Sequence, residues 1–110
     1  MELRFKFWVE EEGRTLFGQG TLGLLENILL FGSIQRAAEE MKMSYRQAWG
    51  HLKRTEKRLG LRLVEAKRGG SGGGGTVLTP QGKELLDKLS NFKSLGQCKL
   101  EELFRAVFEE

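Results

Sequence analysis

The stretch from Gly32 to Leu59 limits what this chain can fold into more than any other, because it predicts two short helices joined by a tight turn. The first helix begins after the N-cap Ser33 and carries one buried stripe at the i, i+3, i+4, i+7 spacing. That stripe consists of Ile34, Ala37, Ala38 and Met41. Positions 42 and 43 form the turn, Ser44 caps the second helix, and Gln47 completes a capping box with it. The pattern is a helix-turn-helix whose second helix carries the function.

Basic residues gather in and after this motif. The whole chain has a formal net charge of +3, but residues 42–68 alone carry +7, from nine Lys or Arg against Glu56 and Glu65, which leaves −4 for the rest. Neutralising phosphates supplies most of the sequence-independent affinity of proteins for nucleic acids. The charge distribution therefore predicts a nucleic-acid surface, with a merely solvated basic face as the alternative.

The residues before the motif predict supporting elements. Residues 3–9 alternate as a strand, with Leu3, Phe5, Phe7 and Val9 on the face that packs on the core. A polar turn over 10–13 leads into a second short strand over 15–17. Residues 21–31 then form a mostly apolar helix that ends at Gly32. Its inward-facing residues are Leu22, Leu25, Ile28 and Leu29.

A β-hairpin is predicted after Gly60 ends the second helix. Residues 61–65 alternate as a strand, and 76–78 form a β-rich run that can pair antiparallel with 61–66. The tract between them, 69–75, is glycine except for Ser71. Taken alone it matches an engineered flexible linker or G-x-G-x-x-G, but a following strand argues against a dinucleotide fingerprint, and the absence of a following lysine excludes a P-loop. A hairpin directly after a recognition helix is a wing.

A long helix is predicted from Thr79 and Pro80, an N-cap followed by proline in the first turn. Its apolar residues keep a three-four spacing nearly to residue 110. A single helix of about 30 residues would be roughly 45 Å long, more than this domain can cover, so the simplest interpretation is a homodimer. Two shorter helices, broken at 94–96 and folded back on the core, are the alternative. The candidate dimer-interface residues are Leu85, Leu89, Phe92, Leu100, Leu103 and Val107.

The second helix of the motif divides into a buried and a DNA-facing side. Ala48, Leu52, Thr55 and Leu59 form the buried stripe, Trp49 lies near the core boundary as a packing residue, and His51 lies on the flank as a surface residue. A helix in the major groove contacts bases with its N-terminal residues and phosphates with later ones. The base-reading candidates are Ser44, Tyr45, Arg46, Gln47 and Gly50, with Arg46 suited to guanine and Gln47 to adenine. The phosphate candidates are Ser33, Lys53, Arg54, Lys57, Lys67, Arg68, Gly69, Gly70 and Thr76.

Several other classes of protein are not expected. The length of 110 residues predicts one domain, and no run of about 18 apolar residues predicts a membrane span. An acidic cluster within residues 1–12 stands where a signal peptide would need its cleavage site, so we expect a cytoplasmic protein. The single cysteine, Cys98, excludes an internal disulfide and a cysteine-cluster metal site. Without a nucleophile–base pair, carboxylate pair or metal-ligand cluster, we expect no enzyme, no cofactor and no metal.

Two segments together, GSIQRAAEEMKMSYRQAWGHLKRTEKRLG (32–60) and LVEAKRGGSGGGGTVLTPQGKELL (63–86), resemble the N-terminal DNA-binding domain of the molybdate-responsive (ModE) regulators, a winged-helix group related to LysR-type regulators. The resemblance covers nearly the whole chain. It implies an α+β, mostly α fold: a winged helix-turn-helix over 1–79, with its wing at 61–79, and a long C-terminal dimerisation helix over 80–110.

The same resemblance implies a homodimer that is joined through the terminal helix and the N-terminal strand and binds a palindromic operator in double-stranded DNA. Members that sense molybdate resemble this domain followed by a separate oxyanion-binding module. Because this sequence stops at residue 110, molybdate is not expected as a ligand. The alternative function is a winged-helix module that binds a partner protein without specific DNA binding.

Overall fold

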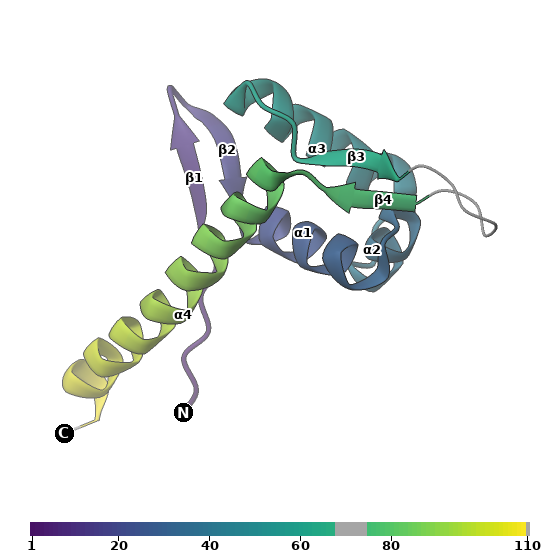
Figure 1. Cartoon of the computed structure of the whole chain (residues 1–110). Helices are drawn as coiled ribbons and strands as arrows, with labels where there is room; N and C mark the ends of the chain where they lie inside the picture. The colour runs from purple at the N-terminus through teal and green to yellow at the C-terminus, as the bar shows by residue number, and fades with distance from the viewer. Residues whose placement is uncertain (68–74, 110) are drawn as a thin grey trace.

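The computed structural model describes residues 1–67 and 75–109. The elements in chain order are β1 (Trp8–Glu11), β2 (Arg14–Gly18), α1 (Gln19–Phe31), α2 (Ile34–Glu40), α3 (Tyr45–Leu59), β3 (Val64–Lys67), β4 (Gly75–Leu78) and α4 (Pro80–Phe108). Helices α1, α2 and α3 form a head between the β1–β2 and β3–β4 hairpins, and α4 leads away from it (Figure 1). The predicted architecture, a mostly helical winged helix-turn-helix with a long C-terminal helix, is confirmed.

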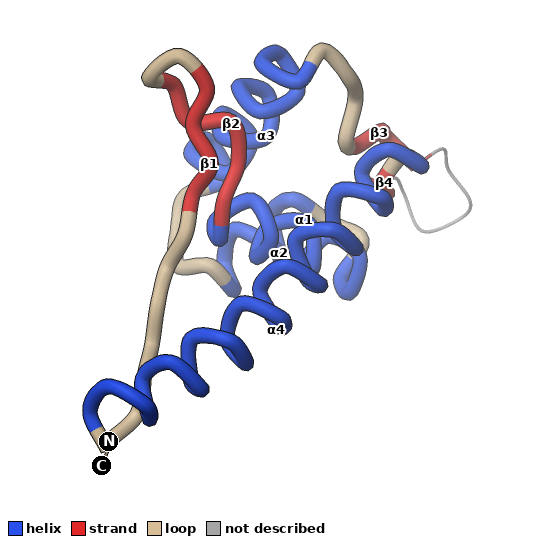
Figure 2. Tube along the Cα trace, turned by 90° about the vertical axis from the view of Figure 1, so that its left-hand side faces the viewer, coloured by secondary structure: helices blue, strands red, loops and turns tan. Residues whose placement is uncertain are grey.

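The N-terminal strand is shorter and later than predicted. Only Trp8–Glu11 is a strand, and it pairs antiparallel with Arg14–Gly18, with Val9 opposite Phe17. Residues 2–7 instead run beside α4 without a strand partner (Figure 2). Alternation is kept there, because Leu3 and Phe5 are half-buried between exposed neighbours, whereas Val9 is exposed and not packed as predicted.

Contacts with α4 explain why these residues form no ladder. The Gln97 side chain Nε2 donates a hydrogen bond to the Leu3 carbonyl at 3.2 Å. The Phe7 ring meets the Phe92 ring edge-to-face, with centroids 5.0 Å apart. An extended segment that packs its side chains on a helix shows the same period of two as a strand, but a helix surface offers no row of backbone partners.

Helix α1 forms the centre of the core. It begins at Gln19, two residues before the predicted start, and Thr21 Oγ1 accepts a hydrogen bond from the Gly18 N–H at its N-cap. Leu22, Leu25 and Ile28 are buried as predicted. Leu29 is exposed instead, at the edge of a groove that α1 forms with α4, and Leu24 is fully buried. Because α1 packs against five other elements, its buried arc is broader than a single stripe and is displaced from Leu29.

The two helices of the motif are capped as predicted. Ser33 Oγ accepts from the Arg36 N–H at 3.1 Å, and Ser44 Oγ accepts from the Gln47 N–H at 3.0 Å. Gln47 Oε1 in turn accepts from the Ser44 N–H at 2.9 Å, which completes the capping box. Lys42 in the turn has a φ of +56°, and α3 ends at Gly60 with a φ of +69°.

The wing is confirmed as an antiparallel hairpin, with Val64 opposite Leu78 and Lys67 opposite Gly75. Its first strand starts at Val64 and not at residue 61, because the preceding carbonyls are bound by the N-cap of α4. The Thr79 N–H donates to the Leu63 carbonyl at 2.9 Å, and Thr79 Oγ1 donates to the Arg62 carbonyl at 2.5 Å.

Helix α4 is continuous from Pro80 to Phe108, which excludes the alternative of two short helices broken at 94–96. Leu86 and Leu89 pack in the core, and the rest of the helix extends beyond the head to give a molecule of 60 × 32 × 25 Å. Leu89, predicted at the dimer interface, is therefore only 3% exposed within its own chain, and Leu85 is half-buried against the core. Phe92, Leu103 and Val107 are exposed.

Candidate nucleic-acid interface

The start of α3 presents most of the predicted base-reading residues together. Ser44, Tyr45, Arg46 and Gln47 are all exposed, and Gly50 follows half-buried one turn later. The structure places them on neighbouring positions of a capped helix end, because the Ser44–Gln47 box fixes where α3 begins. A helix end of this kind can bring polar side chains to base edges in a major groove.

The side chain of Gln47, a predicted adenine reader, also takes part in the capping box of α3. Bidentate recognition of adenine uses both the oxygen and the nitrogen of the side-chain amide. Gln47 Oε1 already accepts a hydrogen bond from the Ser44 N–H at 2.9 Å. An amide oxygen can accept two hydrogen bonds, and the amide nitrogen of Gln47 takes no part in the box, so the box restricts the orientation of the side chain but leaves bidentate contact open to it.

Trp49 is more exposed than the packing role predicted for it. Its side chain is 46% exposed, and the Lys53 ammonium lies 5.6 Å from the centre of its ring. Position 49 is about 90° from the centre of the buried stripe on an ideal helix, at the edge of the packed face. The structure leaves that edge open, so Trp49 and the neighbouring exposed Tyr45 add aromatic surface to the start of α3.

His51 is a packing residue and not the surface residue that was predicted. Its Nε2 lies 2.9 Å from Thr21 Oγ1, so the ring joins α3 to α1. Burial lowers the pKa of His51 below its ordinary value of 6.5, and the positive charge of Arg54 lowers it further. The neutral ring is therefore favoured in the folded chain.

Some basic side chains of α3 are bound to other groups of the chain, and others are exposed without an ion-pair partner among the described residues. The Arg58 guanidinium donates to the Thr15 carbonyl of β2, and Lys53 Nζ lies 3.1 Å from Glu56 Oε1. Arg54 and Lys57 are exposed, and within residues 1–67 and 75–109 neither has a carboxylate at ion-pair distance. Of the phosphate candidates on α3, Arg54 and Lys57 are thus free, and Lys53 is already paired.

The structure describes only some of the phosphate candidates that lie outside α3. Lys67 is exposed at the end of β3, and Ser33 Oγ caps α2. The Thr76 N–H donates to the Gly32 carbonyl at 2.9 Å, so its side chain alone is available to a phosphate. Arg68, Gly69 and Gly70 lie outside the described residues.

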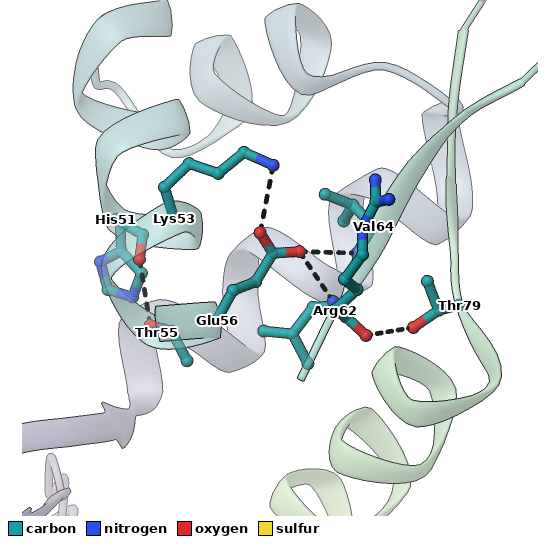
Figure 3. A network of polar contacts seen from close by, with 8 residues as sticks. His51, Lys53, Thr55, Glu56, Arg62, Val64 and Thr79 are labelled. Atoms are coloured by element: carbon teal, nitrogen blue, oxygen red, sulfur yellow. Dashed lines mark hydrogen bonds and ion pairs between the residues drawn. The ribbon is translucent and has the colours of Figure 1, made fainter. Parts of the chain in front are cut away.

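Glu56 is the residue that the sequence reasoning missed, since it was counted only as a negative charge within the basic region. It is 9% exposed and binds Lys53 and the start of β3 (Figure 3). The available signal was its position four residues after Leu52, next to the buried stripe and three residues after a lysine.

The described part of the chain shows no other kind of site. No three His, Cys, Asp or Glu side chains gather in residues 1–67 and 75–109 as metal ligands would. None of the helices found there is both long and apolar enough to cross a membrane.

A capped recognition helix with free basic residues, next to a two-stranded wing, defines the chain as a winged helix-turn-helix protein of the nucleic-acid-binding type. It belongs to the bacterial regulatory helix-turn-helix proteins of the lysR family, whose family model matches residues 21–83. That match begins in α1 and ends in the first turn of α4, so it contains the whole motif and the wing.

Similar proteins include molybdenum-related regulators. The chain is 44% identical over 63 residues to the transcriptional regulator ModE of Haemophilus influenzae, which is 57% of this chain and 25% of that protein. It is 41% identical over 69 residues to the molybdenum-pterin-binding protein MopB of Rhodobacter capsulatus, 63% of this chain and 26% of that one. It is 40% identical over 65 residues to the DNA-binding transcriptional dual regulator ModE of Escherichia coli K12, which is 59% of this chain and 25% of that protein. The matched region thus spans about a quarter of the length of these relatives.

Solved structures confirm the fold. The DNA-binding domain of BenM, in complex with its benA site 1 DNA, matches with a TM-score of 0.64 and 18% identity over 82% of this chain and 96% of that one. The DNA-bound domain of CbnR matches with a TM-score of 0.65 and 21% identity over 79% of this chain and 94% of that one. At these identities the likeness concerns the fold alone.

Proposed function

We propose that this chain is a sequence-specific DNA-binding transcription regulator that binds a palindromic operator in double-stranded DNA as a homodimer. The exposed, capped start of α3 carries the proposal, because the exposed side chains of Arg46, Arg54 and Lys57 follow one another along a single helix beside the wing. Membership of a regulatory helix-turn-helix family and the DNA complexes of BenM and CbnR support it.

In this proposal, residues 1–79 form the DNA-binding unit, and residues 80–110 the dimerisation helix of the same domain. Helix α3 lies in the major groove, and the wing lies on the backbone or in the minor groove. Ser44, Tyr45, Arg46, Gln47 and Gly50 face the bases. The phosphate contacts come from Ser33, Lys53, Arg54, Lys57, Lys67 and Thr76 and from positions 68–70.

Selection of bound sequences from a random DNA pool is the first test of this proposal. We expect a palindrome with two half-sites to be enriched, because each copy of a homodimer presents one α3 to the DNA. The affinity for that sequence is expected to fall steeply as salt increases. Absence of any retardation at low salt would contradict DNA binding and favour the partner-protein alternative.

Arg46 and Lys57 separate base contacts from phosphate contacts. Arg46→Ala is expected to cost about 1–3 kcal/mol on the selected operator and to relax the preference at one base position. Lys57→Ala is expected to weaken binding to all sequences and to reduce the salt slope by about one. Fluorescence anisotropy with the operator and a scrambled duplex measures both effects. The same uniform loss in both variants would contradict this division of roles.

We further propose that this activity belongs to the cytoplasm, involves no catalytic step or cofactor, and needs no molybdate. In support, the match with each of these molybdenum-related regulators covers only about a quarter of that relative's length. Calorimetric titration of this chain with molybdate should show no heat of binding, and tight binding would contradict this part of the proposal.

A further inference from the structure

Glu56 connects the recognition helix to the wing. It lies on α3, and its Oε2 accepts hydrogen bonds from the backbone N–H groups of Leu63 at 2.8 Å and Val64 at 3.2 Å. Its Oε1 accepts from Lys53 Nζ at 3.1 Å (Figure 3). Val64 is the first residue of β3, so the carboxylate binds the chain at the point where the wing begins.

The same point is fixed from the opposite side by α4. The carbonyls of Arg62 and Leu63 accept hydrogen bonds from the side chain and the N–H of Thr79, which is the N-cap of α4. The N–H groups of Leu63 and Val64 thus donate to α3, and the carbonyls of Arg62 and Leu63 accept from the N-cap of α4. Thr79 attaches this segment to α4, and the Glu56 carboxylate attaches it to the recognition helix α3.

Glu56 has an environment suited to a charged carboxylate. Burial by itself raises the pKa of Glu56, but the hydrogen bonds from Leu63, Lys53 and Val64 and the charge of Lys53 outweigh burial and hold the pKa below its ordinary value. Hydrogen bonds to an ionised acceptor are stronger than those between neutral groups, and a buried carboxylate left without partners is costly. The arrangement therefore favours one fixed position of the wing relative to α3.

We propose that Glu56 is a positioning residue that sets the placement of the wing relative to the recognition helix, and so determines whether both can contact DNA at once. This inference rests on the proposed function, since it assigns a DNA contact to the wing. It also predicts that Lys53, held by Glu56, contributes less to the salt dependence of binding than the free Lys57.

The first test uses the free protein and needs no DNA. Glu56→Ala is expected to speed amide hydrogen exchange at Leu63 and Val64 by about tenfold or more, because both N–H groups lose their acceptor. Exchange at Leu24 and Leu25 in α1 serves as the control for an intact fold. Glu56→Gln, which keeps one acceptor oxygen, is expected to restore part of the protection. Unchanged exchange at Leu63 and Val64 in a folded Glu56→Ala variant would overturn the proposal.

The second test uses hydroxyl-radical footprinting on the selected operator. Glu56→Ala is expected to lose protection where the wing lies, while the major-groove protection and base preference of α3 remain, with an overall loss of affinity of about tenfold. Lys53→Met removes the ion pair but leaves both backbone hydrogen bonds, so wing protection is expected to persist. Glu65→Gln, on the exposed side of β3, is the matched control for loss of a nearby carboxylate and is expected to behave as wild type.

The outcomes separate this inference from the proposed function. Equal loss of wing and helix protection in Glu56→Ala would overturn the positioning role. If the wild-type chain binds no DNA, the proposed function fails, and so does the assignment of a DNA contact to the wing. The amide exchange result still decides whether Glu56 holds the wing. If Glu56→Ala does not fold, Glu56→Gln takes its place in both tests, with the same expected direction and a smaller effect.

Discussion

His51 is held at the contact between the recognition helix and α1, where its ring meets the Thr21 hydroxyl. Because burial and Arg54 lower its pKa below 6.5, the unfolded chain takes up a proton at a higher pH than the folded chain does. The contribution of the neutral ring to stability is therefore complete above pH 6.5 and is lost as the pH falls below that value. One such group changes the free energy of unfolding by at most about 1.4 kcal/mol per pH unit.

We expect His51→Gln to flatten this dependence between pH 8 and pH 5, a window that lies above the ordinary pKa of 4.5 for Glu56. Urea unfolding at several pH values, followed by circular dichroism, measures the slope of stability against pH. Thr21→Val serves as a control, because it removes the hydroxyl partner but leaves the titrating ring. A wild-type slope in His51→Gln would show that another group is responsible.

At the residue scale, a side chain's role was predictable when its hydrogen-bond partner lay only a few residues away in the sequence. Ser33, Ser44 and Thr79 were predicted as caps because each bonds an N–H only three residues further on. His51 and Glu56 bond to groups that are 30, 7 and 8 residues away, on elements whose placement a helical wheel does not give. A helical wheel puts both positions beside the buried stripe, but it contains no information about which element covers that edge.

The first turn of α4 packs closely on the entry to the wing. A Cβ added at Gly82 would lie 2.1 Å from the Leu63 carbonyl oxygen, so backbone would have to move. We expect Gly82→Ala to destabilise the chain by about 1–3 kcal/mol or more, despite the higher helix propensity of alanine. Urea unfolding at pH 7 measures the loss.

Gly96 in the middle of the same helix provides the matched control. A Cβ there would lie 3.4 Å from the edge of the Phe5 ring, which is a side chain and can adjust. Gly96→Ala is therefore expected to be neutral or to stabilise the chain by up to about 1 kcal/mol. Equal stability of Gly82→Ala and wild type would contradict the close approach of α4 to Leu63.

At the element scale, the helices and the wing were predictable because capping residues and a period of 3.6 or 2 define them locally. The N-terminal segment was not, since its alternation fits a strand partner and a helix surface equally well. The wing strand was placed too early, because residues 61–63 alternate like a strand although their carbonyls bind the cap of α4. Continuity of α4 through Gly96 was left open by the sequence and is settled by the structure.

The whole molecule exposes apolar side chains along the outer half of α4, including Phe92, Leu95, Leu103 and Val107. Exposed apolar surface at helical spacing favours packing against another helix, which supports the proposed homodimer. We expect Leu103→Glu to shift the chain from dimer to monomer, as measured by size-exclusion chromatography with light scattering.

Ser94→Glu is the matched control for that variant. It adds the same charge to the same helix nine residues earlier, about 180° away around the axis. Ser94→Glu is expected to remain a dimer, and both variants should keep the fold of the head. A dimeric Leu103→Glu variant, or a wild-type chain that is monomeric at high concentration, would contradict the proposed interface.

At the scale of the whole molecule, the sequence predicted the class of fold and a row of apolar residues along α4. It did not predict which of those residues pack in the core of their own chain and which stay exposed for a partner. Leu86 and Leu89 fill the core of their own chain, and only the residues beyond them are left for a partner. Where that division falls depends on where the head ends against α4, which is a tertiary property and has no local signal.

The attachment of α4 to the wing makes the helix a lever arm. Its 29 residues extend about 44 Å at 1.5 Å per residue, and its N-cap, Thr79, is hydrogen-bonded to residues 62 and 63. A tilt of 10° at that turn would move the far end by roughly 8 Å, about two base-pair steps along DNA. In a dimer joined through α4, the half-site spacing that the protein accepts would then depend less on α3 than on the angle set at Thr79.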